Sequence, residues 1–183
     1  MAEAHKKNND IRSAIESYLN VADPKNEDSA KFNAALIEML NDDKSDNKLD
    51  NQLISTIQNN NVKGNVLLER GLLLASDQSE KAKISIEQFI DEFPKHERIA
   101  EAHLAIASLF LQESPTNYDS ANNSLTKGKA HAVRSSDKER ADYLDFWINE
   151  NSTEIDLIEL KGNSFVEKWP NSSHSPEIRM RLG

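Results

Sequence analysis

The five histidines are the first residues whose chemistry could suit a metal site. In the segment HERIAEAH, His96 and His103 open and close the run. Two histidine ligands on one helical face need a spacing of four, and the residue four after His96 is Ala100. His96 is also expected in an exposed turn beside Pro94. We therefore predict no metal site here.

The segment NDDKSDNKLDNQ, residues 41–52, carries alternating oxygen side chains in the manner of a calcium loop. Asp46 stands where the loop needs a turn glycine, and Gln52 stands where it needs a bidentate glutamate. The segment therefore predicts a solvated loop between helices.

Catalysis has no residue set to support it. The chain has no cysteine, Lys127-Gly128-Lys129 lacks the glycine-rich lead of a phosphate-binding loop, and no Ser/His/Asp order occurs in a recognisable local context. We predict a protein that is not an enzyme, with no catalytic residues and no cofactor.

Charge and hydropathy limit the partners. The formal net charge is -9 and the basic residues are scattered, which argues against nucleic acid. The longest apolar run, 104–111, is far shorter than the roughly 20 residues of a membrane span, so direct membrane insertion is not expected.

Elements that could position a binding surface are predicted to be helices throughout. Only 5 glycines and 5 prolines punctuate the chain, and apolar residues recur three and four apart. Polar clusters divide it into nine predicted helices and a fragment of a tenth.

An internal repeat relates two segments 76 residues apart, FIDEFPKHERIAEAHLAI and FVEKWPNSSHSPEIRMRL. Phe89 aligns with Phe165, and the pair Phe93-Pro94 aligns with Trp169-Pro170. Each proline is expected to end a helix and turn the chain.

Helix starts near Ser79, Thr116 and Thr153 recur every 37 residues, the length of one helix pair with its turns. Because one amphipathic pair cannot bury both faces, such pairs stack on their neighbours. The sequence thus predicts an all-α superhelical solenoid of about four and a half antiparallel helix pairs, and a compact four-helix bundle is the alternative.

These residues resemble tetratricopeptide repeats, whose helix pairs form a right-handed superhelix. His103, Ile106, Ala107 and Phe110 fit a first helix, and Ala82, Ile86, Phe89 and Pro94 fit a second. The resemblance covers residues 62–183, with the last repeat truncated, whereas residues 1–61 fit as divergent helical repeats of the same continuous domain. Gly162 and Asp145 depart from the pattern.

The aromatic-proline turn is similar to repeats of bacterial envelope proteins, such as the outer-membrane assembly lipoprotein and periplasmic cell-division coordinators. This similarity implies a periplasmic or envelope location within a larger protein, with a cytoplasmic one as the alternative. We accordingly expect the chain to be an excised segment.

The resemblance implies a protein-protein interaction scaffold whose concave groove binds a peptide or partner protein. The matching groove positions are Asn65, Leu68, Leu72, Glu101, Leu104, Ser108, Asp142, Phe146 and Asn149. Leucines at helical spacing can equally be core residues. Tyr143 and Trp147, four apart, form a further stripe that faces either a partner or the next repeat. The alternative function is a self-associating or spacer module.

Overall fold

The computed structural model describes residues 11–21, 23, 26–41, 54–77, 79–150 and 155–183. All regular secondary structure among these residues is helical, and they contain no strand. The predicted all-α class is therefore confirmed. The contacts divide the chain into two compact units, unit 1 (1–96) and unit 2 (97–183).

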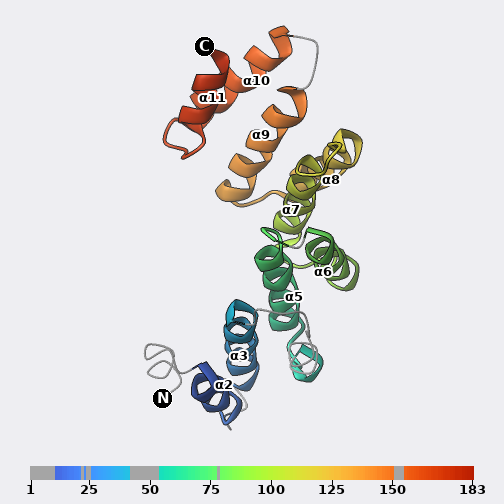
Figure 1. The fold of residues 1–183 in the computed structure, drawn as a ribbon, viewed down its shortest axis with the longest axis vertical. Coiled ribbons are helices and arrows are strands. Elements are labelled where there is room, and N and C mark those ends of the chain that lie inside the picture. The colour runs from blue at the N-terminus through green and yellow to red at the C-terminus, as the bar shows by residue number, and fades with distance from the viewer. Residues whose placement is uncertain (1–10, 22, 24–25, 42–53, 78, 151–154) are drawn as a thin grey trace. The chain divides into compact units, whose positions relative to one another are not determined.

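Unit 1 contains α2 (Ile11–Leu19), α3 (Glu27–Asn41), α5 (Asn60–Leu74) and α6 (Ser79–Glu92). Helix α3 packs on α2 and on α5, and α5 packs on α6 (Figure 1). The division predicted at residue 61 thus falls inside unit 1, within the first turn of α5.

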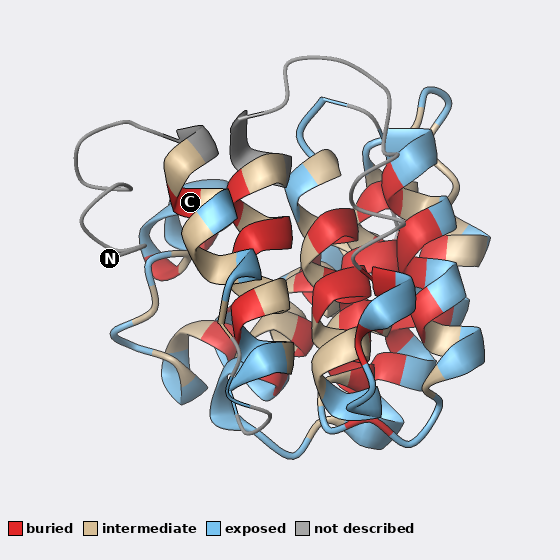
Figure 2. Ribbon diagram, turned by 90° about the horizontal axis from the view of Figure 1, so that it is seen from below, coloured by how far each residue is buried: buried red, intermediate tan, exposed pale blue. Residues whose placement is uncertain are grey.

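Unit 2 contains α7 (Ile99–Leu111), α8 (Tyr118–His131), α9 (Ser135–Glu150), α10 (Ile155–Lys168) and α11 (Ser175–Leu182). Each helix packs on the next one in the chain, and α9 also packs on α7. In Figure 2, the buried residues lie in stripes along the helices, and the exposed residues lie on the opposite faces.

Asparagine side chains start two of these helices. Asn59 Oδ1 accepts hydrogen bonds from the backbone N–H groups of Asn61 (2.9 Å) and Val62 (3.2 Å), and Asn117 Oδ1 accepts one from Ser120 (3.1 Å). These bonds satisfy N–H groups that a helix leaves without a partner in its first turn.

The two aromatic-proline turns repeat in structure as they do in sequence. Helices α6 and α10 end one residue before Phe93 and Trp169 respectively. The backbone hydrogen bonds match pair by pair: Phe93 to Phe89 (2.9 Å) and Trp169 to Phe165 (2.8 Å), then His96 to Phe93 and Ser172 to Trp169 (both 3.0 Å). The predicted role of Pro94 and Pro170 in ending the helices is confirmed.

His96 corrects one sequence prediction. The residue is buried, with 8% of its surface exposed, rather than lying in an exposed turn. Its ring meets the ring of Phe89 edge-on at 5.1 Å, and Nε2 lies 3.1 Å from the carbonyl oxygen of Asn61. Gly64 makes room for it, because a Cβ there would lie 2.9 Å from the imidazole. His96 therefore anchors the turn to α5.

Two further glycines allow helices to approach closely. A Cβ on Gly71 of α5 would lie 2.3 Å from Ile86 Cγ1 of α6, and a Cβ on Gly162 of α10 would lie 2.8 Å from Leu182 of α11. Both glycines are buried, so each interface depends on the missing side chain.

Candidate partner-binding groove

Three of the nine residues predicted to line a groove are core residues. Leu68, Leu104 and Phe146 are fully buried. Leu104 belongs to a cluster with Leu125 and Leu144, and Phe146 packs with Phe165 and Ile178. A fully buried side chain cannot contact a partner on the surface, so a groove-lining role is wrong for these three.

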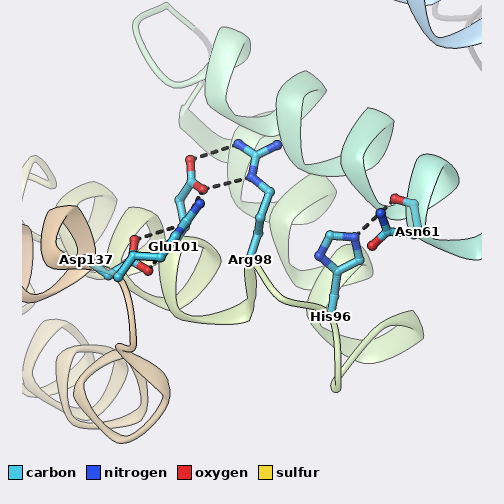
Figure 3. A network of polar contacts seen from close by, with 6 residues as sticks. Asn61, His96, Arg98, Glu101 and Asp137 are labelled. Atoms are coloured by element: carbon cyan, nitrogen blue, oxygen red, sulfur yellow. Dashed lines mark hydrogen bonds and ion pairs between the residues drawn. The ribbon is translucent and has the colours of Figure 1, made fainter. Parts of the chain in front are cut away.

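Glu101 holds two helix starts together. Its carboxylate accepts a two-pronged hydrogen bond from Arg98 (2.8 and 2.9 Å) and a third from Arg134 Nη2 (2.9 Å). Arg134 in turn donates to both oxygens of Asp137 (2.8 and 2.9 Å), which belongs to the first turn of α9 (Figure 3).

Burial alone would raise the pKa of Glu101, but the guanidinium groups of Arg98 and Arg134 outweigh it and lower that pKa to about 2. The carboxylates of Asp137 and Glu101 raise the pKa of Arg134. The Glu101 carboxylate is thus committed to joining α7 and α9.

The side chains of Asp142 and Asn149 also form hydrogen bonds with other residues of the chain. Asp142 Oδ2 accepts hydrogen bonds from Lys168 Nζ (2.6 Å) and Trp169 Nε1 (2.9 Å), which tie α9 to the end of α10. The Asn149 amide donates to the carbonyl oxygen of Asp145 at 2.7 Å. These contacts account for the polarity of both residues without a partner.

Asp145, which departs from the repeat pattern, also joins helices. Its carboxylate pairs with Lys161 of α10 (2.5 Å) and Lys129 of α8 (3.1 Å). Burial would raise its pKa, and the two ammonium groups lower it below its usual value. The Asp145 carboxylate, half-buried on α9, thus links this helix to both α8 and α10.

Ser108 is the predicted residue that lines a cavity. It borders two neighbouring cavities of about 330 and 450 Å³, which also share Tyr143 and Leu144 and open to the surface. We name the two together the α9 groove, because α9 contributes more of the lining residues than any other helix. Asn65 and Leu72, half-buried on α5, line neither cavity.

The smaller cavity has an apolar and aromatic wall with an acidic edge. Leu111 and Leu144 meet Tyr143 and Trp147 there, and the remaining wall residues are Ser108, Gln112, Thr116, Tyr118, Glu150 and Glu177. Its volume is near the lower end of the range of about 300–1,000 Å³ that is typical of ligand pockets.

Tyr143 is the central side chain of the α9 groove. Its ring stacks on His174 at 3.9 Å and meets Trp147 edge-on at 6.1 Å, and its hydroxyl donates to Glu177 (3.1 Å). Burial raises the pKa of the Tyr143 hydroxyl, so that it remains a hydrogen-bond donor at neutral pH. These contacts fix the side chain between the two cavities.

Arg140 borders the larger cavity together with Ser136, Glu139 and His174. It donates to Ser108 Oγ at 3.3 Å. Burial lowers the pKa of the Arg140 guanidinium, whereas the carboxylates of Glu101 and Asp137 raise it. Its positive charge therefore already has two negative neighbours.

The residues of α9 that face the groove were only partly foreseen. Arg140, Tyr143, Trp147 and Glu150 recur at spacings of three and four, so they share one helical face. The sequence singled out Tyr143 and Trp147 but placed the groove on Asp142, Phe146 and Asn149. The mixed aromatic and charged stripe was the signal that could have identified the face.

Metal ligands do not gather in the described part of the chain, where no three His, Asp or Glu side chains are grouped to hold an ion. The calcium-like segment 41–52 lies almost wholly outside the described residues. None of the described helices is both long and apolar enough to span a membrane.

Comparison with protein-family models, with curated proteins and with solved structures finds no match for this chain. The resemblance to tetratricopeptide repeats therefore stays a prediction, and the case for function depends on the α9 groove itself.

Proposed function

We propose that this chain is a non-enzymatic adaptor that binds a peptide or an extended segment of a partner protein in the α9 groove. The observation that carries the proposal is the pair of adjoining cavities that share Ser108, Tyr143 and Leu144. A surface with an aromatic wall and several polar side chains suits a peptide, because apolar anchors and a few hydrogen bonds together give affinity and specificity.

The proposal includes a repeat architecture of tetratricopeptide type, a right-handed solenoid of antiparallel helix pairs. Two features support it: the matching hydrogen bonds of the two aromatic-proline turns, and the packing of helices on neighbours close in sequence. Interactions between near neighbours are typical of repeat proteins. A periplasmic or envelope location within a larger protein belongs to the same proposal and follows from the resemblance of the turns.

A displayed library of random peptides tests binding in the groove. Peptides selected on the full chain should lose affinity for Gln112→Trp, since Gln112 is exposed at the edge of the smaller cavity and a tryptophan there would fill it. Lys127→Trp, on an exposed position of α8, is the matched control. If no peptide is selected, or if both variants bind equally well, the adaptor proposal fails.

Self-association is the second candidate function, and exposed apolar side chains favour it. Ile155 and Leu160 of α10 and Met180 of α11 are 69%, 65% and 78% exposed. A second copy of the chain could remove apolar side chains of this kind from water. Light scattering over a concentration series should then show a dimer that Leu160→Glu disrupts, and a monomer at all concentrations would exclude this alternative.

A further inference from the structure

We infer that the segment bound in the α9 groove is basic and carries a large apolar or aromatic anchor residue. The inference depends on the adaptor proposal and specifies the chemistry of its ligand. It follows from the charges at the edge of the groove, from a contact that the chain makes with its own arginine, and from the wall of the smaller cavity.

The fixed charges of the groove are mainly negative. Glu139, Glu150 and Glu177 line it, against the single cation Arg140. Within the described residues, neither Glu139 nor Glu177 has a lysine or arginine partner. The carboxylate of Glu139, and the part of the Glu177 carboxylate that the Tyr143 hydroxyl does not engage, can thus pair with a positively charged ligand.

Arg140 does not make the groove attractive to anions. The carboxylates of Glu101 and Asp137 act on its charge from the start of α7 and α9. A bound anion would meet these negative charges as well as the arginine. The net charge of -9 for the whole chain acts in the same sense, because it attracts basic partners over longer distances.

The chain itself shows which cation the groove accepts. Arg181 of α11 forms an ion pair with Glu150, and its guanidinium lies over the ring of Trp147, 6.0 Å from the centroid. Arg181 remains 56% exposed, so a ligand can displace it. Glu177 offers a second guanidinium or ammonium a carboxylate in the same cavity.

The anchor residue is inferred from the smaller cavity. Leu111, Leu144, Tyr143 and Trp147 form the apolar part of its wall, and its volume is about 330 Å³. A leucine, phenylalanine or tryptophan side chain of the ligand would cover these residues, while flanking basic residues reach the carboxylates. Aromatic anchors surrounded by polar contacts are the usual source of affinity in such interfaces.

The test is the amino-acid composition of the peptides that the full chain selects from the random library. Selected peptides should be enriched in lysine and arginine around one large apolar residue. Their affinity, measured by fluorescence anisotropy, should fall by roughly threefold for each of Glu139→Gln and Glu177→Gln, the size expected of one exposed ion pair. Glu159→Gln, on an exposed position of α10, is the matched control and should change nothing.

Two further measurements separate the electrostatic contribution to peptide affinity from the contribution of apolar packing. Raising the salt from about 0.05 to about 0.5 M should weaken binding, because screening acts on exposed charges. Arg181→Gln should strengthen binding by about two- to threefold, since it frees Glu150 and the Trp147 ring.

The possible results distinguish a failure of this inference from a failure of the adaptor proposal on which it depends. Selected peptides that are neutral or acidic, bind the groove and ignore both glutamate changes would overturn the inference and leave the adaptor proposal standing. Selection of no peptide, or of peptides that Gln112→Trp does not affect, would overturn both.

Discussion

Replacing Glu101 with glutamine should destabilise unit 2 by an amount that depends on pH. The carboxylate accepts three hydrogen bonds from Arg98 and Arg134, and its side chain is 20% exposed. Glutamine keeps the shape of the side chain and removes its charge. The variant therefore isolates the electrostatic contribution of the link between α7 and α9.

The magnitude follows from the pKa of Glu101, which is about 2 in the folded protein against an ordinary value of 4.5. That difference corresponds to about 3 kcal/mol of stabilisation by the charged form. Arg134 is 45% exposed, so water and salt screen part of this attraction, and we expect Glu101→Gln to cost about 2 kcal/mol at pH 7.

The sign of the pH dependence is fixed by the lowered pKa. A carboxyl group whose pKa falls on folding stabilises the folded state fully above its unfolded value, here near 4.5, and loses that effect as the pH falls toward 2. By about pH 3, more than half of the difference between the wild type and the variant should have disappeared.

Urea denaturation followed by tryptophan fluorescence measures this difference directly, because Trp147 and Trp169 are the two tryptophans of the chain and both belong to unit 2. Glu97→Gln, an exposed position two residues before α7, is the control. A loss for Glu101→Gln that is the same at pH 7 and pH 3, or no larger than that of the control, would refute the reasoning.

Three further predictions concern packing and protonation. Phe89→Ala should lower the free energy of unfolding by about 3–5 kcal/mol and His96→Ala by about 1–3 kcal/mol, because the two side chains are buried against each other. Thermal unfolding followed by circular dichroism measures both losses, and no loss for His96→Ala would contradict the prediction. Gly71→Ala should cost about 1–3 kcal/mol through its clash with Ile86, and the double variant with Ile86→Ala should cost less than the sum of the single changes in the same assay. Burial, together with the nearby charges on α8, lowers the pKa of His103 below 6.5. The wild type should therefore lose stability relative to His103→Gln as the pH falls below 6.5 in urea titrations. A constant difference in stability between pH 7.5 and pH 5 would contradict this prediction.

Local chain chemistry made the turns predictable from sequence. A proline removes a backbone donor and restricts the residue before it, so Pro94 and Pro170 locate the ends of α6 and α10 without reference to the rest of the fold. The aligned Phe89 and Phe165 then identify the buried face of each helix, and both are buried. These features depend on few neighbours in the chain.

The face of α9 that carries the groove depends on several helices and was not predictable in the same way. Helical spacing shows which residues share a face but does not show which face a neighbour covers. Since α9 packs on α7, α8 and α10, more than one of its stripes is covered. Phe146 is fully buried for this reason, and the stripe with Tyr143 and Trp147 is left to line the cavities.

The two copies of the repeat differ in the positions of their large and small residues, and Gly162 is one of these positions. Shifting by 76 residues aligns Gly71 with Trp147 and Ile86 with Gly162. In unit 1 the glycine is on the first helix and the large residue is on the second, where Gly71 meets Ile86. In unit 2 the order in the sequence is reversed, with Trp147 on α9 and Gly162 on α10. The side chain that fills the space at Gly162 is Leu182 of α11.

The same shift aligns Gly64 with Arg140 and His96 with Ser172, which is a second reversal of large and small residues in the sequence. Both reversals place the larger side chain on α9, and both of these side chains, Arg140 and Trp147, border the α9 groove. The two copies of the repeat thus keep the same turn, but α9 carries a cation and an indole ring at the two positions where α5 carries glycines. Because α5 lacks these side chains, the binding chemistry that we propose for unit 2 is not expected on α5.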